Sequence, residues 1–265
     1  MNRSVNLNDL TWTEIAQAIR RKALLMFSVG SIEQHGYHLP LGVDTYLPLT
    51  ISQRVAGEID AVVAPPINYG YKSLYRSGGG PNFPGSIGVK GRTLISMVSD
   101  IFQEFINQGW KYFLVLDWHL ENVPFVYEGI DEALAQHEAC HEIKIVKIDN
   151  PNGLAVSHDP DLMDFLFGED FPGWAVEHAS IWETSAMMSA YPELVNEDEI
   201  RDGSPPEPFE YDLLPVPKRQ DRDTGVFWKA SQATPEKGQR ILNAATQAIL
   251  KVIHEEFPEI SNKKE

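Results

Sequence analysis

Short apolar runs alternate with longer amphipathic segments along this chain. A run that is apolar at almost every position is typical of a strand buried on both faces, as in a parallel sheet. Such runs lie at 23–29, 61–67, 112–116 and 143–148. Segments with apolar residues at steps of three and four are expected to be helices. They lie at 47–59, 93–108, 126–136, 177–190 and from Pro235 onward, with Thr234 as N-cap. We therefore expect an α/β fold with a mostly parallel β-sheet flanked by helices on both faces.

The length of 265 residues suits one such unit, because α/β folds often run to about 250 residues as a single domain. We expect residues 1–265 to form one domain, with a proline- and acid-rich excursion near 200–232. Residues 68–90 are rich in glycine and show no periodicity, so a loop is expected there. Long loops inside compact domains are usually functional.

The charge of the chain argues against several classes of partner. Lys and Arg number 22 and Asp and Glu number 38, so the net charge is −16. Such a surface repels phosphate backbones and anionic lipid headgroups, so neither nucleic-acid nor membrane binding is expected. Cys140 is the single cysteine, which excludes an intrachain disulfide and a Cys-rich zinc site. Residues 1–12 have no signal-peptide core, and no apolar run reaches about 18 residues, so we expect a cytoplasmic protein.

Carboxylates and histidines follow two of the predicted strands. Glu33 and His35 come after the first strand, with Asp44 further on, and His119 and Glu121 come after the third. Ligands of open α/β sheets bind beyond the carboxyl ends of the strands. Residues i and i+2 of an extended segment point to the same side. We therefore expect each strand end to present a carboxylate and an imidazole together.

Three carboxylates and two imidazoles favour a metal centre. They suit two divalent ions about 3.5–4 Å apart, with one carboxylate bridging them. This nitrogen and oxygen set favours Zn²⁺ or Mn²⁺ over Cu(I) or an iron–sulfur cluster. Burying three carboxylates together without metal would be unfavourable. The alternative is that each histidine separately caps a turn or packs in the core.

A series of motifs in order along most of the chain resembles the creatininase family, in its creatinine amidohydrolase branch. Each piece alone is a weak signal, but the ordered series is highly specific. The matching segments are Glu33-Gln34-His35-Gly36, His38-Leu39-Pro40, Val43-Asp44, Tyr69-Gly70-Tyr71-Lys72-Ser73, Ser77-Gly78-Gly79-Gly80, Phe83-Pro84-Gly85, His119 with Glu121-Asn122, Gly173-Trp174, Glu177-His178, Glu183-Thr184-Ser185 and Tyr191-Pro192.

The resemblance implies a dinuclear site in which Asp44 bridges the two ions. It implies that Glu33 and His119 hold one ion, and that His35 and Glu121 hold the other. It further implies that a metal-bound hydroxide hydrolyses a C–N bond of a small cyclic amide, and that the chains assemble as a homohexamer.

The leaving nitrogen of such a reaction needs a proton, and His178 is the candidate to carry it. The resemblance assigns His178 the same role; the alternative is a residue on a helix face. Glu177 is expected either to orient His178 or to bind substrate, so we count it, with Glu121, among the catalytic residues. Glu183 is expected to be a structural partner of the metal site.

Further residues are expected to bind substrate. The resemblance makes Trp174 a lid over a planar ring, although an isolated tryptophan is as often a core residue. Ser77, Gly78 and Gly79 are also expected to contact substrate, because the glycines let backbone amides approach a ligand; the alternative is that they only form a sharp turn.

Four positions depart from the creatininase pattern. Leu120 replaces a tyrosine, Leu154 aligns with a pocket tryptophan, and Asp117-Trp118 replaces Asn-Gly. We therefore expect Leu120 and Trp118 to shape the substrate pocket, with creatinine as the first substrate and a preference shifted toward a more aliphatic or bulkier ring. A formamidopyrimidine deformylase, a small-peptide hydrolase and a non-enzymatic metal-binding protein are the alternatives.

Overall fold

Four parallel strands form the centre of the protein. The computed structural model describes residues 4–137, 140–171, 173–205, 210–218 and 224–260. The strands are β1 (Leu24–Val29), β2 (Ala61–Val63), β3 (Tyr112–Asp117) and β4 (Lys144–Ile148), in the order β2-β1-β3-β4. β1 pairs with both β2 and β3, and each pair is parallel. The expected parallel sheet is therefore confirmed.

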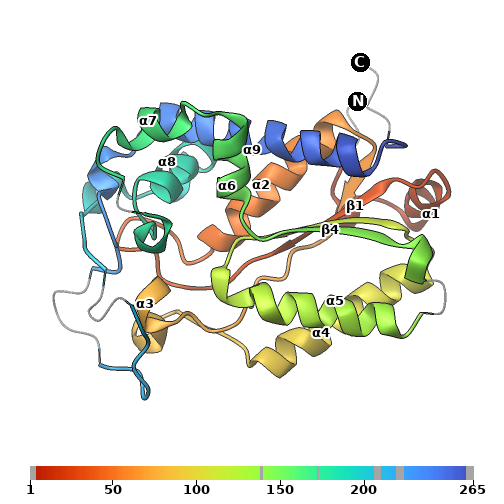
Figure 1. The fold of residues 1–265 in the computed structure, drawn as a ribbon, viewed down its shortest axis with the longest axis horizontal. Helices are drawn as coiled ribbons and strands as arrows, with labels where there is room; N and C mark the ends of the chain where they lie inside the picture. The colour runs from red at the N-terminus through yellow and green to blue at the C-terminus, as the bar shows by residue number, and fades with distance from the viewer. Residues whose placement is uncertain (1–3, 138–139, 172, 206–209, 219–223, 261–265) are drawn as a thin grey trace.

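Helices cover both faces of the sheet (Figure 1). One face packs against α1 (Trp12–Arg20), α4 (Gly91–Asn107) and α5 (Val123–Ala135). The other packs against α2 (Val43–Glu58), α6 (Pro151–His158), α7 (Leu162–Phe167), α8 (Ile181–Ala190) and α9 (Pro235–Glu256). Short turns complete the described part: α3 (Tyr75–Gly78) and the 3-10 helices Leu7–Asp9, Gly80–Asn82, Leu120–Asn122, Cys140–Glu142, Trp174–Val176, Pro192–Leu194, Glu197–Glu199 and Ala230–Gln232.

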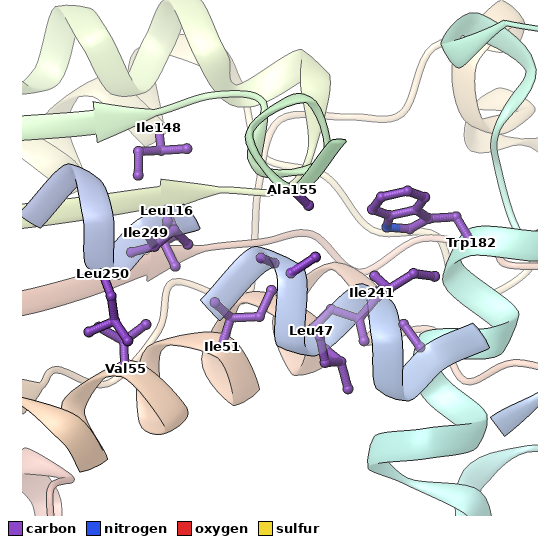
Figure 2. Close-up of a cluster of buried hydrophobic side chains, with 14 of the residues drawn as sticks. Leu47, Ile51, Val55, Leu116, Ile148, Ala155, Trp182, Ile241, Ile249 and Leu250 are labelled. Carbon is purple, nitrogen blue, oxygen red and sulfur yellow. The ribbon is translucent and has the colours of Figure 1, made fainter. Parts of the chain in front are cut away.

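β1 and β2 are buried along their whole length because helices cover both faces of the sheet, whereas the edge strand β4 carries two lysines and is only partly buried. In β1, Leu24 and Met26 point to one core, while Leu25, Phe27 and Val29 point to the other. This alternation is what a period of two residues produces in a sheet covered on both sides. Figure 2 shows the larger core, which lies between the sheet, α2 and α9.

The N-terminus of α9 follows from its sequence. The Thr234 hydroxyl accepts a hydrogen bond of 3.3 Å from the backbone N–H of Lys237, and Pro235 occupies the first turn, where its missing N–H is not needed. The predicted start of this helix is confirmed. None of the helices in the described ranges is both long and apolar enough to cross a membrane.

Several predicted boundaries were wrong. The strand expected at 61–67 ends at Val63, because Pro65 and Pro66 cannot donate ladder hydrogen bonds. The helix expected from residue 47 begins at Val43, so Asp44 lies in its first turn. The stretch expected to be a loop at 68–90 contains α3 and the 3-10 helix at 80–82. Residues 206–209 and 219–223 of the expected excursion lie outside the described ranges, and its other residues from 201 to 229 are irregular.

Candidate active site

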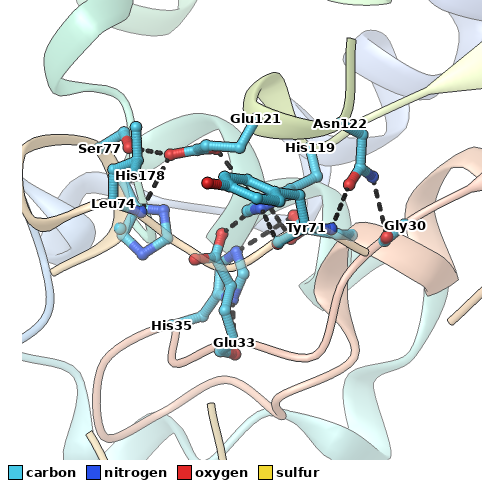
Figure 3. A network of polar contacts seen from close by, with 12 residues as sticks. Gly30, Glu33, His35, Tyr71, Leu74, Ser77, His119, Glu121, Asn122 and His178 are labelled. Atoms are coloured by element: carbon cyan, nitrogen blue, oxygen red, sulfur yellow. Dashed lines mark hydrogen bonds and ion pairs between the residues drawn. The ribbon is translucent and has the colours of Figure 1, made fainter. Parts of the chain in front are cut away.

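The loops after β1 and β3 meet at the carboxyl edge of the sheet (Figure 3). Glu33 and His35 lie in the loop after β1, His119 follows β3, and Asp44 comes from α2. All four side chains are buried, with 4% exposure at most. A cavity of about 380 Å³ opens onto this cluster. The structure thus brings together side chains that the sequence placed at two separate strand ends.

Backbone carbonyls orient both histidines. His119 Nε2 donates to the Tyr71 carbonyl at 3.0 Å, so Nδ1 is the nitrogen that faces the cluster. His35 is turned the opposite way: Nδ1 donates to the carbonyl of Glu33 at 3.2 Å and leaves Nε2 to face the cluster. A carbonyl only accepts hydrogen bonds, so each contact fixes which nitrogen is available as a ligand.

Among the described residues, the potential ligand atoms form three groups: one joins Glu33, His35 and His178, and the other two share Asp44. Glu33, Asp44 and His119 make the first of these two, and His35, Asp44 and Glu183 make the second. Within each group the three atoms lie within 4.8 Å of one another. Asp44 Oδ1 is 3.4 Å from His35 Nε2, while Asp44 Oδ2 is 3.3 Å from His119 Nδ1. One carboxylate therefore faces both histidines, as a bridging ligand must.

Glu183 is a residue whose place in this cluster the sequence did not indicate. It lies in the first turn of α8, and its Oε2 is 3.6 Å from His35 Nε2. Only its place in the Glu183-Thr184-Ser185 motif marked it, and we expected a structural partner there. The residue is remote in sequence from His35, so no local spacing could place them together.

Glu121 lies beside His119, and its expected role as a ligand of the second ion stays a prediction. Its Oε2 is 3.4 Å from His119 Nε2, and its Oε1 accepts hydrogen bonds from the Ser77 hydroxyl and, at 3.2 Å, from the backbone N–H of Leu74 (Figure 3). His35 is grouped with Glu183 instead of Glu121. The pairing of Glu121 with His35 came from the family resemblance alone, and residues 120–122, which follow β3, form a 3-10 helix.

The chemistry of the cluster fits divalent metal ions. The buried Glu33 Oε2 and Asp44 Oδ2 have no hydrogen-bond partner within the described residues. Unpaired buried oxygens of this kind are unfavourable unless a cation or a donor meets them. Neutral imidazole nitrogens and carboxylate oxygens are the ligands that Zn²⁺ and Mn²⁺ accept. The residues present therefore suit two ions that share Asp44.

Without metal, protons would balance these carboxylates. Burial disfavours the charged ring of His35, but Asp44 and Glu183 outweigh it and hold the pKa of His35 well above its ordinary value. Burial likewise opposes the charge on His119, yet Glu33 and Asp44 raise its pKa well above the ordinary value. The carboxylates thus favour the protonated form of both imidazoles, and a metal ion competes with protons for their ring nitrogens.

Asn122 ties the loops of the site together. Its Oδ1 accepts from the backbone N–H of Tyr71 at 2.7 Å, and its Nδ2 donates to the carbonyl of Gly30 at 3.0 Å and to Asp117 Oδ1 at 3.3 Å. The side chain is fully buried. Burial raises the pKa of Asp117 to about 7 despite the nearby ammonium of Lys147. Asp117, one of the positions that departs from the creatininase pattern, therefore supports the side chain of Asn122 and does not line the cavity.

His178 borders the cavity close to the cluster. Its ring centroid is 4.5 Å from that of His35, and the side chain is 6% exposed. The helix expected at 177–190 begins only at Ile181, so His178 lies in the preceding loop and not on a helix face. The reason is Glu177, whose Oε1 accepts a hydrogen bond of 2.6 Å from the backbone N–H of Trp182 and whose Oε2 accepts from the Ser180 hydroxyl. This carboxyl caps α8 from outside the helix, and burial raises its pKa to about 8.

The walls of the cavity include most of the expected substrate contacts. Ser77, Trp118, Leu120 and Trp174 line it, together with the segment 149–152 at the start of α6. Leu120 is 70% exposed, whereas Trp174 is 37% exposed. The ring of Trp174 packs edge-on against Trp182, with centroids 5.1 Å apart.

Three expected pocket residues lie elsewhere. Leu154 packs against the larger hydrophobic core, because only the first residues of α6 reach the cavity. Within the described part of the chain, Gly78 and Gly79 are not among the residues that line the cavity. They shape the turn beside it: Gly79 has a φ of +78°, and the carbonyl of Gly78 accepts a hydrogen bond of 2.9 Å from the side chain of Gln34.

Comparison with known proteins places this geometry in a family. A family model described as creatininase, creatinine amidohydrolase, matches residues 8–253. The creatinine amidohydrolase of Pseudomonas putida is 38% identical over 261 residues, which cover 97% of this chain and 99% of that protein.

Solved structures agree with the sequence match. A structure described as creatininase with Mn superposes with a TM-score of 0.90 at 37% identity, covering 96% of this chain and 99% of that one. A mutant creatininase of the Zn-Zn type superposes with a TM-score of 0.91 at 37% identity, covering 97% of this chain and 100% of that one. Since the match extends through the fold and almost the full length of the sequence, this chain belongs to the creatininase family.

Proposed function

We propose that this protein is a dinuclear-metal amidohydrolase that converts creatinine to creatine. The observation that carries the proposal is the pair of ligand groups sharing Asp44 at the end of a cavity, in a chain of this family. In the reaction, the C–N bond of the cyclic amide breaks. The oxygen of water is added to the carbonyl carbon, and a proton is added to the leaving nitrogen.

The two groups that share Asp44 support a choice of metal-binding residues. Glu33 and His119 would hold one ion, His35 and Glu183 would hold the other, and Asp44, which belongs to both groups, would be shared between them. This proposal replaces Glu121 by Glu183 in the second group. When bound, such ions lower the pKa of a water molecule and polarise the carbonyl of a substrate. The ligand set accepts both Zn²⁺ and Mn²⁺.

Protein side chains move the proton and hold the ring. His178 borders the cavity next to His35 and is placed to take a proton from the attacking water and give it to the leaving nitrogen. Glu177 acts by anchoring the start of α8, which keeps the adjacent His178 in place. Trp174 and Trp118 supply flat apolar walls, which suit a planar ring.

The cavity also favours a ring rich in N–H donors, because carboxylates surround it. Glu33, Glu121, Asp149 and Glu183 are among the lining residues. A cyclic guanidine such as creatinine offers donors to such groups. Leu120 and Trp118 are the departures that border the cavity, and Leu120→Tyr is expected to change creatinine kinetics. Leu154→Trp is expected to have no direct effect on the pocket, because Leu154 packs in the core.

The test combines activity with metal content. Creatinine conversion by Mn²⁺-loaded and Zn²⁺-loaded protein is measured together with the number of ions bound per chain. We expect turnover of about 1 s⁻¹ or more, with two ions in the parent and about one in Glu183→Gln. Glu104→Gln is the matched control, because Glu104 is exposed on α4. Two ions retained in Glu183→Gln would refute the ligand assignment, and two ions without turnover on creatinine would refute the substrate.

We also propose that the chain is a single-domain cytoplasmic protein that assembles as a homohexamer. Apolar side chains that are more than half exposed in the described part support an assembly, among them Trp12, Tyr69, Ile87 and Tyr127. Light scattering coupled to size exclusion is expected to show six times the 29.8 kDa of one chain. A monomer at micromolar concentration would refute the hexamer, and recovery in the membrane or periplasmic fraction would refute the location.

A further inference from the structure

Gln34 lies between the two proposed ligands of the first loop, but its own side chain turns toward three other segments. It is 4% exposed. Its Nε2 donates to the carbonyl of Gly78 at 2.9 Å and to the carbonyl of Gly225 at 3.0 Å. Its Oε1 accepts from the backbone N–H of Gly36 at 2.9 Å. Two carbonyls face the NH₂ group and one N–H faces the oxygen, so the amide can have only this orientation.

The backbone approaches this amide too closely for other residues. Gly225 has a φ of +78°, which favours glycine, and a Cβ at this position would overlap Gln34 Oε1. The Gln34 amide is therefore held from several sides by backbone. The side chain is buried and fixed in one orientation, so it cannot exchange hydrogen-bond partners as a surface side chain can.

Both hydrogens of the Gln34 side-chain NH₂ group are already donated to backbone carbonyls, and this determines which ring nitrogen of neutral His178 carries its hydrogen. His178 Nε2 lies 2.9 Å from Gln34 Nε2 and 3.0 Å from the backbone carbonyl of Gln34. An NH₂ group has two hydrogens, and the carbonyls of Gly78 and Gly225 take both. No hydrogen remains for His178 Nε2 to accept, whereas the carbonyl can accept one. In the neutral ring, His178 Nε2 therefore carries the hydrogen and donates it to Gln34.

We propose that Gln34 is a positioning residue that selects the Nε2–H tautomer of His178 and thereby leaves Nδ1 as the nitrogen that exchanges protons with the substrate. This inference names Nδ1 as the atom of His178 that exchanges the proton. It rests on the proposed function only for the role of His178 in proton transfer. It parallels His35 and His119, where one ring nitrogen is also occupied by a backbone carbonyl.

The tautomer can be measured without turnover. In Zn²⁺-loaded protein with ¹⁵N-labelled histidine, the two ring nitrogens of a neutral imidazole have well-separated shifts, and the protonated one couples to its hydrogen. Spectra are recorded at an alkaline pH at which the His178 ring is seen to be neutral, and His178→Asn assigns the signals among the eight histidines. We expect Nε2 of His178 to carry the hydrogen. A hydrogen on Nδ1 in the parent protein would overturn the proposal, and this measurement needs no variant of Gln34.

Gln34→Met tests the selection itself, because methionine keeps the length of the side chain but removes both donors. We expect its His178 signals to move toward a mixture of tautomers, and kcat on creatinine to fall about tenfold or more, with KM changed less than about threefold. Asn122→Ala is the matched control: it also removes a buried amide that joins loops of the site, but it does not touch His178. Its His178 is expected to keep the parental tautomer.

Equal tautomer shifts in Gln34→Met and Asn122→Ala would overturn the proposal, because general loosening of the site would then explain both. An unchanged tautomer in a folded Gln34→Met would also overturn it. A parent protein that shows the Nε2–H tautomer but no creatinine turnover would refute the proposed substrate and leave this inference standing.

Discussion

A methyl group added at Gly78 tests whether Glu33 must lie where the structure places it. Gly78 ends α3, and a Cβ there would meet Glu33 Oε2 and Ser73 Oγ, each more than 1 Å inside ordinary van der Waals contact, which starts at 3.4 Å. Both atoms end side chains, so Gly78→Ala is expected to displace these side chains and leave the backbone in place.

The size of the expected loss of activity follows from how far the Glu33 carboxylate has to move. Glu33 has to move by about 1 Å, and a misplacement of this size near a reacting centre can reduce rates about 100-fold. We therefore expect kcat/KM on creatinine to fall about 100-fold, which is a transition-state loss of about 2.7 kcal/mol. The free energy of unfolding is expected to change by less than about 1 kcal/mol, or a few degrees in Tm.

Three measurements on Gly78→Ala separate site damage from unfolding: kcat/KM, ions bound per chain after dialysis, and Tm. Gly57→Ala is the control, because Gly57 lies in α2 and a Cβ there meets nothing within 4 Å. It is expected to keep parental activity and to gain up to about 1 kcal/mol in stability. A Gly78→Ala protein with parental kcat/KM and metal content would show that Glu33 tolerates displacement, and the reasoning would be wrong.

Three further predictions concern stability and metal binding. Phe102→Ala is expected to lower the free energy of unfolding by about 3–5 kcal/mol, because Phe102 is fully buried between two aromatic rings; a loss below 1 kcal/mol in urea denaturation would contradict this. Thr234→Ala is expected to lower it by about 1 kcal/mol through loss of the α9 cap, with Thr234→Ser close to the parent. Metal affinity is expected to rise with pH, by up to about tenfold per unit for each proton displaced, since the carboxylates that raise the pKa of His35 and of His119 favour protonated rings, with which a metal ion competes. Calorimetric Mn²⁺ titrations at two pH values measure this, and an affinity independent of pH would rule it out.

The sequence alone predicted the parallel sheet and the carboxyl edge where the chemistry lies. Apolar runs and helical periods are local properties, so the strands and their flanking helices could be inferred without knowing their neighbours. Glu33, His35 and His119 were recognisable because they follow buried strands directly. The family resemblance added that Asp44 bridges the ions and supported His178 as the proton carrier, although neither residue directly follows a predicted strand. That the chain forms a single domain stays a prediction.

Only the tertiary structure decided which groups meet. Glu183 reaches His35 because α8 packs beside the loop after β1, an arrangement that no spacing along the chain encodes. Leu154 faces the core and not the pocket because of how α6 sits on the sheet. Both hydrogens of the Gln34 NH₂ group are donated to the carbonyls of Gly78 and Gly225, which are remote from Gln34 in the sequence. A sequence pattern describes the faces of single elements, whereas the partners of a buried polar atom depend on how those elements pack in three dimensions.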